Sequence, residues 1–174
     1  NQFLKENQSG KSAVKSLDGF RRFPAWMWKN KEMLSFVEQL KEINLQKPAE
    51  ERVAFYGLDL YSMYSSIEAV ISYLDKVDPD AAQMARKRYA CFYRYGNDDD
   101  SYGQAMNYVK ENCQKQVIEQ LLELQKKRNE YLQKNNLQGN EELFYAEQNA
   151  KVAKDAEQYY REMFSRRAKT WNLR

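Results

Sequence analysis

The side chains that could perform catalysis in this chain are carboxylates, tyrosines and lysines, because the sequence contains no histidine. Histidine is the commonest general base near neutral pH and the commonest metal ligand. A Ser/His/Asp triad, a Cys/His pair and a histidine-containing zinc site are therefore excluded. Two cysteines alone cannot complete a structural zinc site. The sequence predicts no bound metal and no cofactor.

Asp59 and Tyr61 have the position expected of ligand-binding residues. They follow a short apolar run, VAFY at 53–56, whose residue types favour a strand and which stops at Gly57. A helical period begins beyond Asp59. The pattern predicts a strand over about 52–58, a tight turn and a helix. Open α/β proteins bind ligands beyond the carboxyl ends of their strands, so we expect Asp59 and Tyr61 to border a substrate cleft.

A cluster of aromatic residues around Pro24 supplies further candidates for lining this cleft. Phe20, Phe23, Trp26 and Trp28 fall within nine positions, and Arg22 lies among them. Arg22, Trp26 and Trp28 are the candidate cleft residues in this segment. Burial in the core is the favoured interpretation of the aromatic rings, since large aromatic side chains dominate small cores whatever the function.

Charged residues elsewhere have ordinary structural explanations. The acidic run NDDDS at 97–101 lacks the ligand spacing, mid-loop glycine and distal glutamate of a calcium loop, which favours a polar turn. Arg86, Lys87 and Arg94 could hold an anion, but a solvated basic face is favoured. Glu147 and Glu157 fall on or beside the apolar face of the last helix. There they need arginine or tyrosine partners, or they face a site completed by another chain.

Hydrophobic periodicity predicts a mainly α fold, a bundle of about five helices with the one short strand. Asn30, Ser62 and Asp78 are suitable N-caps, and Pro79 suits a first helical position. Residues 1–17 are polar and are expected to be flexible. The last helix carries an apolar face wide enough for several neighbouring helices, which favours an intramolecular bundle over a coiled coil. The helices are expected over 31–44, 63–77, 79–95, 102–134 and 141–169.

Composition restricts the class of protein. The 174 residues fit one domain, and 43% hydrophobic with 14% aromatic residues suffice for a core. A net charge of +3 from 28 basic and 25 acidic residues gives no basic surface for nucleic acid. No stretch approaches the ~20 apolar residues needed to span a membrane. Two cysteines, expected to be free thiols rather than a bridge, fit a reducing compartment. We expect a cytoplasmic protein without membrane contact.

Five segments closely resemble the erythromycin esterase-like family, in the same order along the chain. They cover nearly all of residues 17–174, and the tryptophan-rich and FYGLDLYS stretches are the most specific. The segments are GFRRFPAWMWKN (19–30), ERVAFYGLDLYSMYSSIEAVISYLDKVDP (51–79), RKRYACF (86–92), ELFYAEQNAKVAKDAEQYYREMF (142–164) and the final TWNLR.

This resemblance implies a bacterial, metal-independent hydrolase acting on esters or lactones, in which some members open macrolide rings in response to antibiotics. Some relatives are fused to phosphoribosyltransferase or protein isoaspartate methyltransferase modules. The family's catalytic histidines and glutamates lie in two regions that by order precede Asn1 and follow Arg174. No catalytic residue therefore transfers to this sequence, which also lacks an initiator methionine. We expect the middle, helix-rich fragment of a larger α/β hydrolase fold.

The function predicted from the sequence is accordingly to form walls of a cleft rather than to catalyse alone. The expected partners are the remaining segments of the parent enzyme, its small-molecule ester or lactone, and a second copy in a homodimer of the isolated fragment. The alternative is a non-catalytic helical interaction module derived from the same family, which would bind a protein through the broad face of the last helix.

Overall fold

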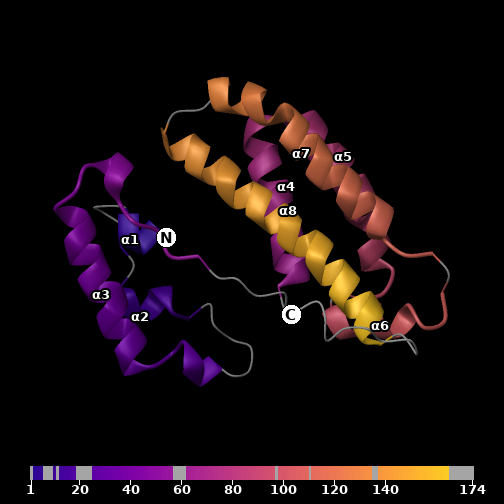
Figure 1. Ribbon diagram of the computed structural model, residues 1–174, viewed down its shortest axis with the longest axis horizontal. Helices are drawn as coiled ribbons and strands as arrows, with labels where there is room; N and C mark the ends of the chain where they lie inside the picture. The colour runs from indigo at the N-terminus through magenta and orange to yellow at the C-terminus, as the bar shows by residue number, and fades with distance from the viewer. Residues whose placement is uncertain are drawn as a thin grey trace. The chain divides into compact units, whose positions relative to one another are not determined.

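Helices joined by short loops account for most of the part of the chain that the structure describes. The computed structural model describes residues 2–5, 10, 12–18, 25–56, 62–96, 98–109, 111–134 and 137–164. Within these ranges it contains eight α-helices, two short 3-10 helices and no strand, so the prediction of a mainly α fold is confirmed (Figure 1). The chain divides into two units, Asn1–Leu58 and Asp59–Arg174, and each is described by itself.

The first unit is built on helix α3 (Lys31–Leu45), which the Asn30 side chain caps by accepting a hydrogen bond from the Met33 amide at 2.7 Å. Two one-turn helices, α1 (Gln2–Lys5) and α2 (Ala13–Ser16), pack against α3, and 3-10 turns occupy Ala25–Met27 and Ala49–Glu51. The core of this unit is small. Its buried members are Leu4, Ala13, Leu17 and Val37.

The strand predicted over 52–58 is wrong for residues 52–56, which have no regular structure, while 57 and 58 lie outside the described residues. The buried side chain of Asn44 takes the place of a neighbouring strand. Its amide donates to the Val53 carbonyl and accepts from the Val53 N–H, both at 2.8 Å. A β-favouring run can remain extended without a sheet when a side chain pairs with its backbone.

The second unit contains α4 (Met63–Val77), α5 (Pro79–Tyr93), α6 (Asp99–Ala105), α7 (Gln114–Lys134) and α8 (Leu137–Met163). Helix α8 packs against α4, α6 and α7, and α5 packs against α4 (Figure 1). The apolar face of α8 is buried through Ala146, Ala150, Ala153 and Ala156, whose small side chains permit close helix contact. The predicted intramolecular use of this wide face is therefore confirmed.

The long helix predicted over 102–134 is wrong, because it is interrupted between α6 and α7. Helix α6 begins earlier than expected, since the Asp98 side chain caps it by accepting from the Ser101 amide at 2.9 Å. Cys113, immediately before α7, is bonded to Cys91 of α5. The expectation of two free thiols is therefore also wrong. A periodic apolar pattern continues across this break, which is why periodicity alone did not reveal it.

None of the helices in the described ranges is both long and apolar enough to cross a membrane.

Candidate functional site

Of the five residues predicted to border a cleft, Trp26 and Trp28 lie in the part of the chain that the structure describes. Arg22, Asp59 and Tyr61 lie outside the described residues. Trp26 and Trp28 belong to the first unit and are 66% and 43% exposed, so the expectation that they are buried in a core is wrong. The Trp28 ring lies 6.4 Å from that of Phe55, which also meets Phe36 at 5.8 Å. That Trp26 and Trp28 line a cleft stays a prediction.

Glu157 is the most deeply buried carboxylate described, and all its contacts are structural. It lies on α8, fully buried, where it accepts a hydrogen bond from the Tyr102 hydroxyl of α6 at 2.8 Å. Arg161, one turn further along α8, donates through Nε at 2.9 Å. Burial raises the pKa of Tyr102, with the Glu157 charge adding to the effect, so this hydroxyl remains a proton donor. The pair fixes α6 against α8.

Glu147 makes the corresponding contact between α8 and α7. It is almost fully buried, and Arg128 of α7 lies 3.2 Å from its Oε1. A buried carboxylate needs such a partner, because an unpaired charge is costly away from water. The predicted arginine and tyrosine partners of the buried glutamates are thus confirmed. Both carboxylates are engaged in joining helices rather than open to a ligand.

Asp78 carries more contacts than the capping role expected from the sequence. One carboxylate oxygen caps α5 by accepting from the Ala81 amide at 3.0 Å, with Pro79 at the first helical position as predicted. The other oxygen accepts from Lys127 at 2.7 Å and from the Tyr131 hydroxyl at 2.9 Å, both on α7. The Lys127 contact is the main reason that the pKa of Asp78 falls to about 2.

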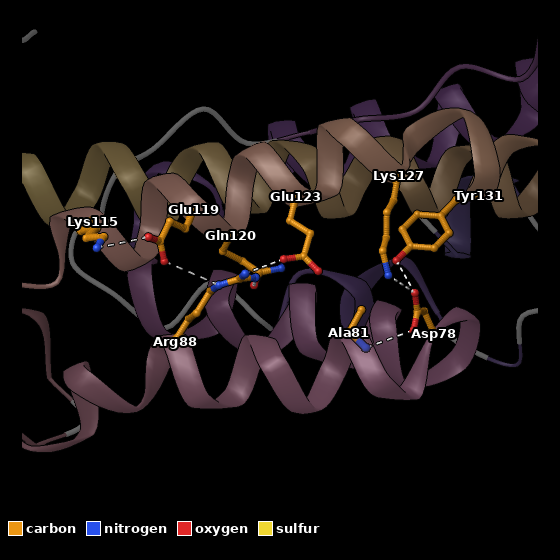
Figure 2. A network of polar contacts seen from close by, with 9 residues as sticks. All are labelled: Asp78, Ala81, Arg88, Lys115, Glu119, Gln120, Glu123, Lys127 and Tyr131. Carbon is orange, nitrogen blue, oxygen red and sulfur yellow. Dashed lines mark hydrogen bonds and ion pairs between the residues drawn. The ribbon is translucent and has the colours of Figure 1, made fainter.

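Arg88 joins the same two helices nearer to the middle of their contact. Its guanidinium donates to the buried Gln120 amide oxygen at 2.9 Å and pairs with Glu123 at 2.5 Å, while Glu119 lies at 3.9 Å. Figure 2 shows these residues and the Asp78 group along the contact between α5 and α7. Sequence reasoning missed this α5–α7 polar seam, because the partners come from segments that no local pattern connects.

A shallow, open groove of about 500 Å³ lies between α4 and α5. The Arg86 guanidinium in it is held by two hydrogen bonds to Asp75, at 2.9 and 2.5 Å. An arginine held bidentately by a carboxylate is not available to capture an anion. The Asp75 contact therefore supports the interpretation of Arg86 as part of a solvated basic face rather than of an anion-binding site. The groove is lined by Glu68, Ile71, Ser72, Asp75, Arg86 and Tyr93.

Metal binding gains no support from the arrangement of acidic residues. Among the described residues, no three carboxylates or cysteines come together as a metal site would require. Within the acidic run, Asp98 instead caps α6, and the carboxylates of Asp99 and Asp100 lie in the first turn of that helix. Negative charge is favourable at that end of a helix.

Comparison with known protein families matches the erythromycin esterase family over residues 1–174. The chain belongs to the erythromycin esterase family. No solved structure matches it. The resemblance seen in the tryptophan-rich and FYGLDLYS segments is thereby confirmed, and the match extends over the predicted cleft residues as well as the helical bundle.

For a member of the erythromycin esterase family, the described groups have a consistent chemical character. The half-buried Tyr64 and the buried Tyr89 and Tyr131 keep their protons, since desolvation is the largest cause of the raised pKa of each. The buried glutamates are paired with arginines. A general base needs a group poised to accept a proton beside its substrate. The contacts of these tyrosines and glutamates hold helices together, whereas the carboxylates that line the groove between α4 and α5 are those of Glu68 and Asp75, of which Asp75 is bound by Arg86.

Proposed function

We propose that this chain forms cleft walls of an erythromycin esterase-like hydrolase whose catalytic groups come from other segments of the parent enzyme. Membership of the family supports an ester or lactone as the substrate class. The observation that carries the proposal is chemical: the sequence has no histidine, and the buried glutamates that could replace it are already engaged, Glu147 by Arg128 of α7 and Glu157 by Tyr102 of α6 and by Arg161 of its own helix. Asp59, Tyr61, Arg22, Trp26 and Trp28 are the proposed cleft residues.

The exposed tryptophans give this proposal a positive support as well. Large aromatic rings at the surface of the first unit are suited to contact the apolar body of a lactone. Trp26 lies within the Ala25–Met27 turn and Trp28 follows it directly, and the Phe55 ring packs against the Trp28 ring. A wall that positions substrate without reacting with it needs this kind of side chain and no general base.

Hydrolysis by the purified chain is the direct test. The chain is incubated with erythromycin and with a p-nitrophenyl ester, and the products are followed by mass spectrometry and absorbance. We expect no ring-opened product carrying the mass of one added water, and no release of nitrophenol above the rate with heat-denatured chain. Turnover that survives repeated purification would contradict the proposal, because it would require a catalytic group within these 174 residues.

Cleft formation is tested separately by binding. Addition of erythromycin should quench the tryptophan fluorescence of the wild-type chain in a saturable manner. Trp26→Phe and Trp28→Phe should each reduce the quenching, whereas Phe144→Leu, at an exposed position on α8, should leave it unchanged. Equal quenching in all variants would mean that these tryptophans do not line the cleft.

A non-catalytic interaction module remains the second candidate, but its expected binding surface is occupied. The broad face of α8 is buried against α4, α6 and α7, through the alanines and through Tyr159 and Tyr160. A partner protein could not use that face without displacing the chain's own helices. Association of the isolated chain with itself is proposed instead, and light scattering after size-exclusion chromatography should give twice the monomer mass.

A further inference from the structure

The Cys91–Cys113 disulfide joins two places that no helix connects directly. Cys91 lies near the end of α5 and is half-buried, whereas Cys113 lies immediately before α7 and is 1% exposed. Their α-carbons are 5.9 Å apart, with a sequence separation of 22. The bond therefore closes a loop that contains α6 and the segment 106–113.

Helix α6 is held independently of this bond. Tyr102 is fully buried, its ring lies 5.0 Å from that of Phe92, and its hydroxyl donates to Glu157. Gly103 lies against the Tyr160 carbonyl and the Phe164 ring of the C-terminal helix region, so closely that a side chain would collide. These contacts would keep α6 in place after the disulfide is opened.

The segment that follows α6 has few other attachments. Tyr108 is 89% exposed, and the Tyr108 and Val109 amides bond only to the Ala105 carbonyl at the end of α6, at 2.9 and 3.1 Å. At the far end, the Cys113 amide donates to the Tyr102 hydroxyl at 3.1 Å. Met106 packs against the core at one end of this stretch and Cys113 is buried in the core at the other, whereas residues 107–109 and 111 are exposed. Segments with exposed backbone and little buried surface open at low cost.

We propose that the Cys91–Cys113 disulfide is a reversible redox latch that fixes segment 106–113 when oxidised and releases it when reduced. The reductant is a dithiol. Its thiolate attacks the Sγ of Cys91, the more accessible sulfur, and the Cys113 sulfur leaves with the bonding electron pair and takes up a proton. The second thiol then cleaves the mixed disulfide. Two electrons and two protons pass to the cysteines, and the dithiol becomes a disulfide.

The latch acts locally because the helical core does not depend on it. Cys113 is buried in the core cluster of this unit, and Cys91 packs against it, but the other buried members of the cluster come from α4 to α8 and do not need the bond to stay in contact. Opening the bond should therefore change the exchange of one segment rather than unfold the chain. It would give the side chains of Tyr108 and Val109, which are already exposed, a greater range of positions.

The first part of the test establishes the bond. The chain is purified without reductant, exposed to oxidised glutathione and treated with iodoacetamide before its intact mass is measured. Absence of alkylation, followed by two alkylations after dithiothreitol, supports the latch. Two alkylations before reduction would overturn it. Chymotrypsin provides a second readout, because cleavage after Tyr108 within the closed loop leaves fragments that separate only under reducing conditions.

The second part establishes what the bond does. Hydrogen exchange is measured by mass spectrometry in the oxidised chain, the reduced chain and Cys91→Ser, which alters the half-buried position only. Amides 106–113 should exchange ~10-fold faster or more in the two opened forms, since the closed loop restricts the released states. Peptides from α4 and α8 should exchange equally in all three. Unchanged exchange at 106–113, or faster exchange throughout the chain, would overturn the proposal.

Discussion

Asp78 should make the stability of the second unit depend on pH in a way that a single substitution can isolate. Its carboxylate caps α5 and also accepts hydrogen bonds from Lys127 and Tyr131 of α7. Asp78→Asn keeps an amide oxygen able to cap the helix, because asparagine caps about as well as aspartate. It removes the negative charge that holds Lys127. The substitution thus distinguishes the contribution of the Asp78–Lys127 charge pair between α5 and α7 from the contribution of the helix cap.

The magnitude follows from the depressed pKa. The pKa of Asp78 falls from 3.8 to about 2. At about 1.4 kcal/mol per pKa unit, the difference corresponds to roughly 2.5 kcal/mol. The Lys127 side chain is 33% exposed, so solvent screening reduces the expected contribution to about 1–2 kcal/mol. Because the folded pKa is depressed, this stability is fully present above pH ~4 and is lost as the pH falls toward ~2.

Urea unfolding followed by far-UV circular dichroism measures the effect. We expect Asp78→Asn to unfold with about 1–2 kcal/mol less free energy than the wild type near pH 7, and the difference to shrink toward zero near pH ~2. Asp80→Asn is the matched control, since Asp80 is exposed in the first turn of the same helix. A difference for Asp78→Asn that stays constant with pH, or that Asp80→Asn reproduces, would refute the reasoning.

Three further substitutions test the packing of the second unit. The Tyr89 hydroxyl is buried without a hydrogen-bond partner among the described residues, so Tyr89→Phe should leave the urea midpoint unchanged or raise it. Tyr102→Phe should lower the free energy of unfolding by about 1–3 kcal/mol, because Glu157 loses a hydrogen-bond donor. If Tyr89→Phe proved more destabilising than Tyr102→Phe, the result would contradict these contacts. Gly103→Ala places a methyl group 2.8 Å from the Tyr160 carbonyl and should lower the melting temperature, despite the ~1 kcal/mol by which alanine favours a helix. A higher melting temperature would show that α6 lies less closely on α8.

Local sequence signals predicted the helices of this fold well. Caps at Asn30 and Asp78, proline at a first helical position and the wide apolar face of α8 are confirmed, because each depends on residues near one another in the sequence. The strand failed because Val53 pairs with the side chain of Asn44, which no period reveals. The break after α6 was hidden because apolar residues continue through it at helical spacing.

The sequence predicted that the buried glutamates need polar partners, but not which residues those partners are. Charged residues on an apolar helix face need partners, and this condition identified the glutamates of α8 as paired residues. It did not identify Arg128 or Tyr102 as those partners, because the separations between partners reach 55 residues. The α5–α7 seam was missed entirely, since Arg88 and Gln120 look like ordinary surface residues until two helices bring them together.

These contacts also bear on the proposal that the catalytic groups come from outside this bundle. A carboxylate that fixes a helix junction is stabilised by donors at close range, and Glu157 has both a tyrosine and an arginine in that role. A general base must instead give up part of that stabilisation to accept a proton from water or substrate. The same glutamate cannot satisfy both demands without loosening α6 from α8. Trp26 and Trp28 of the first unit are exposed, as the proposed contact with a substrate requires.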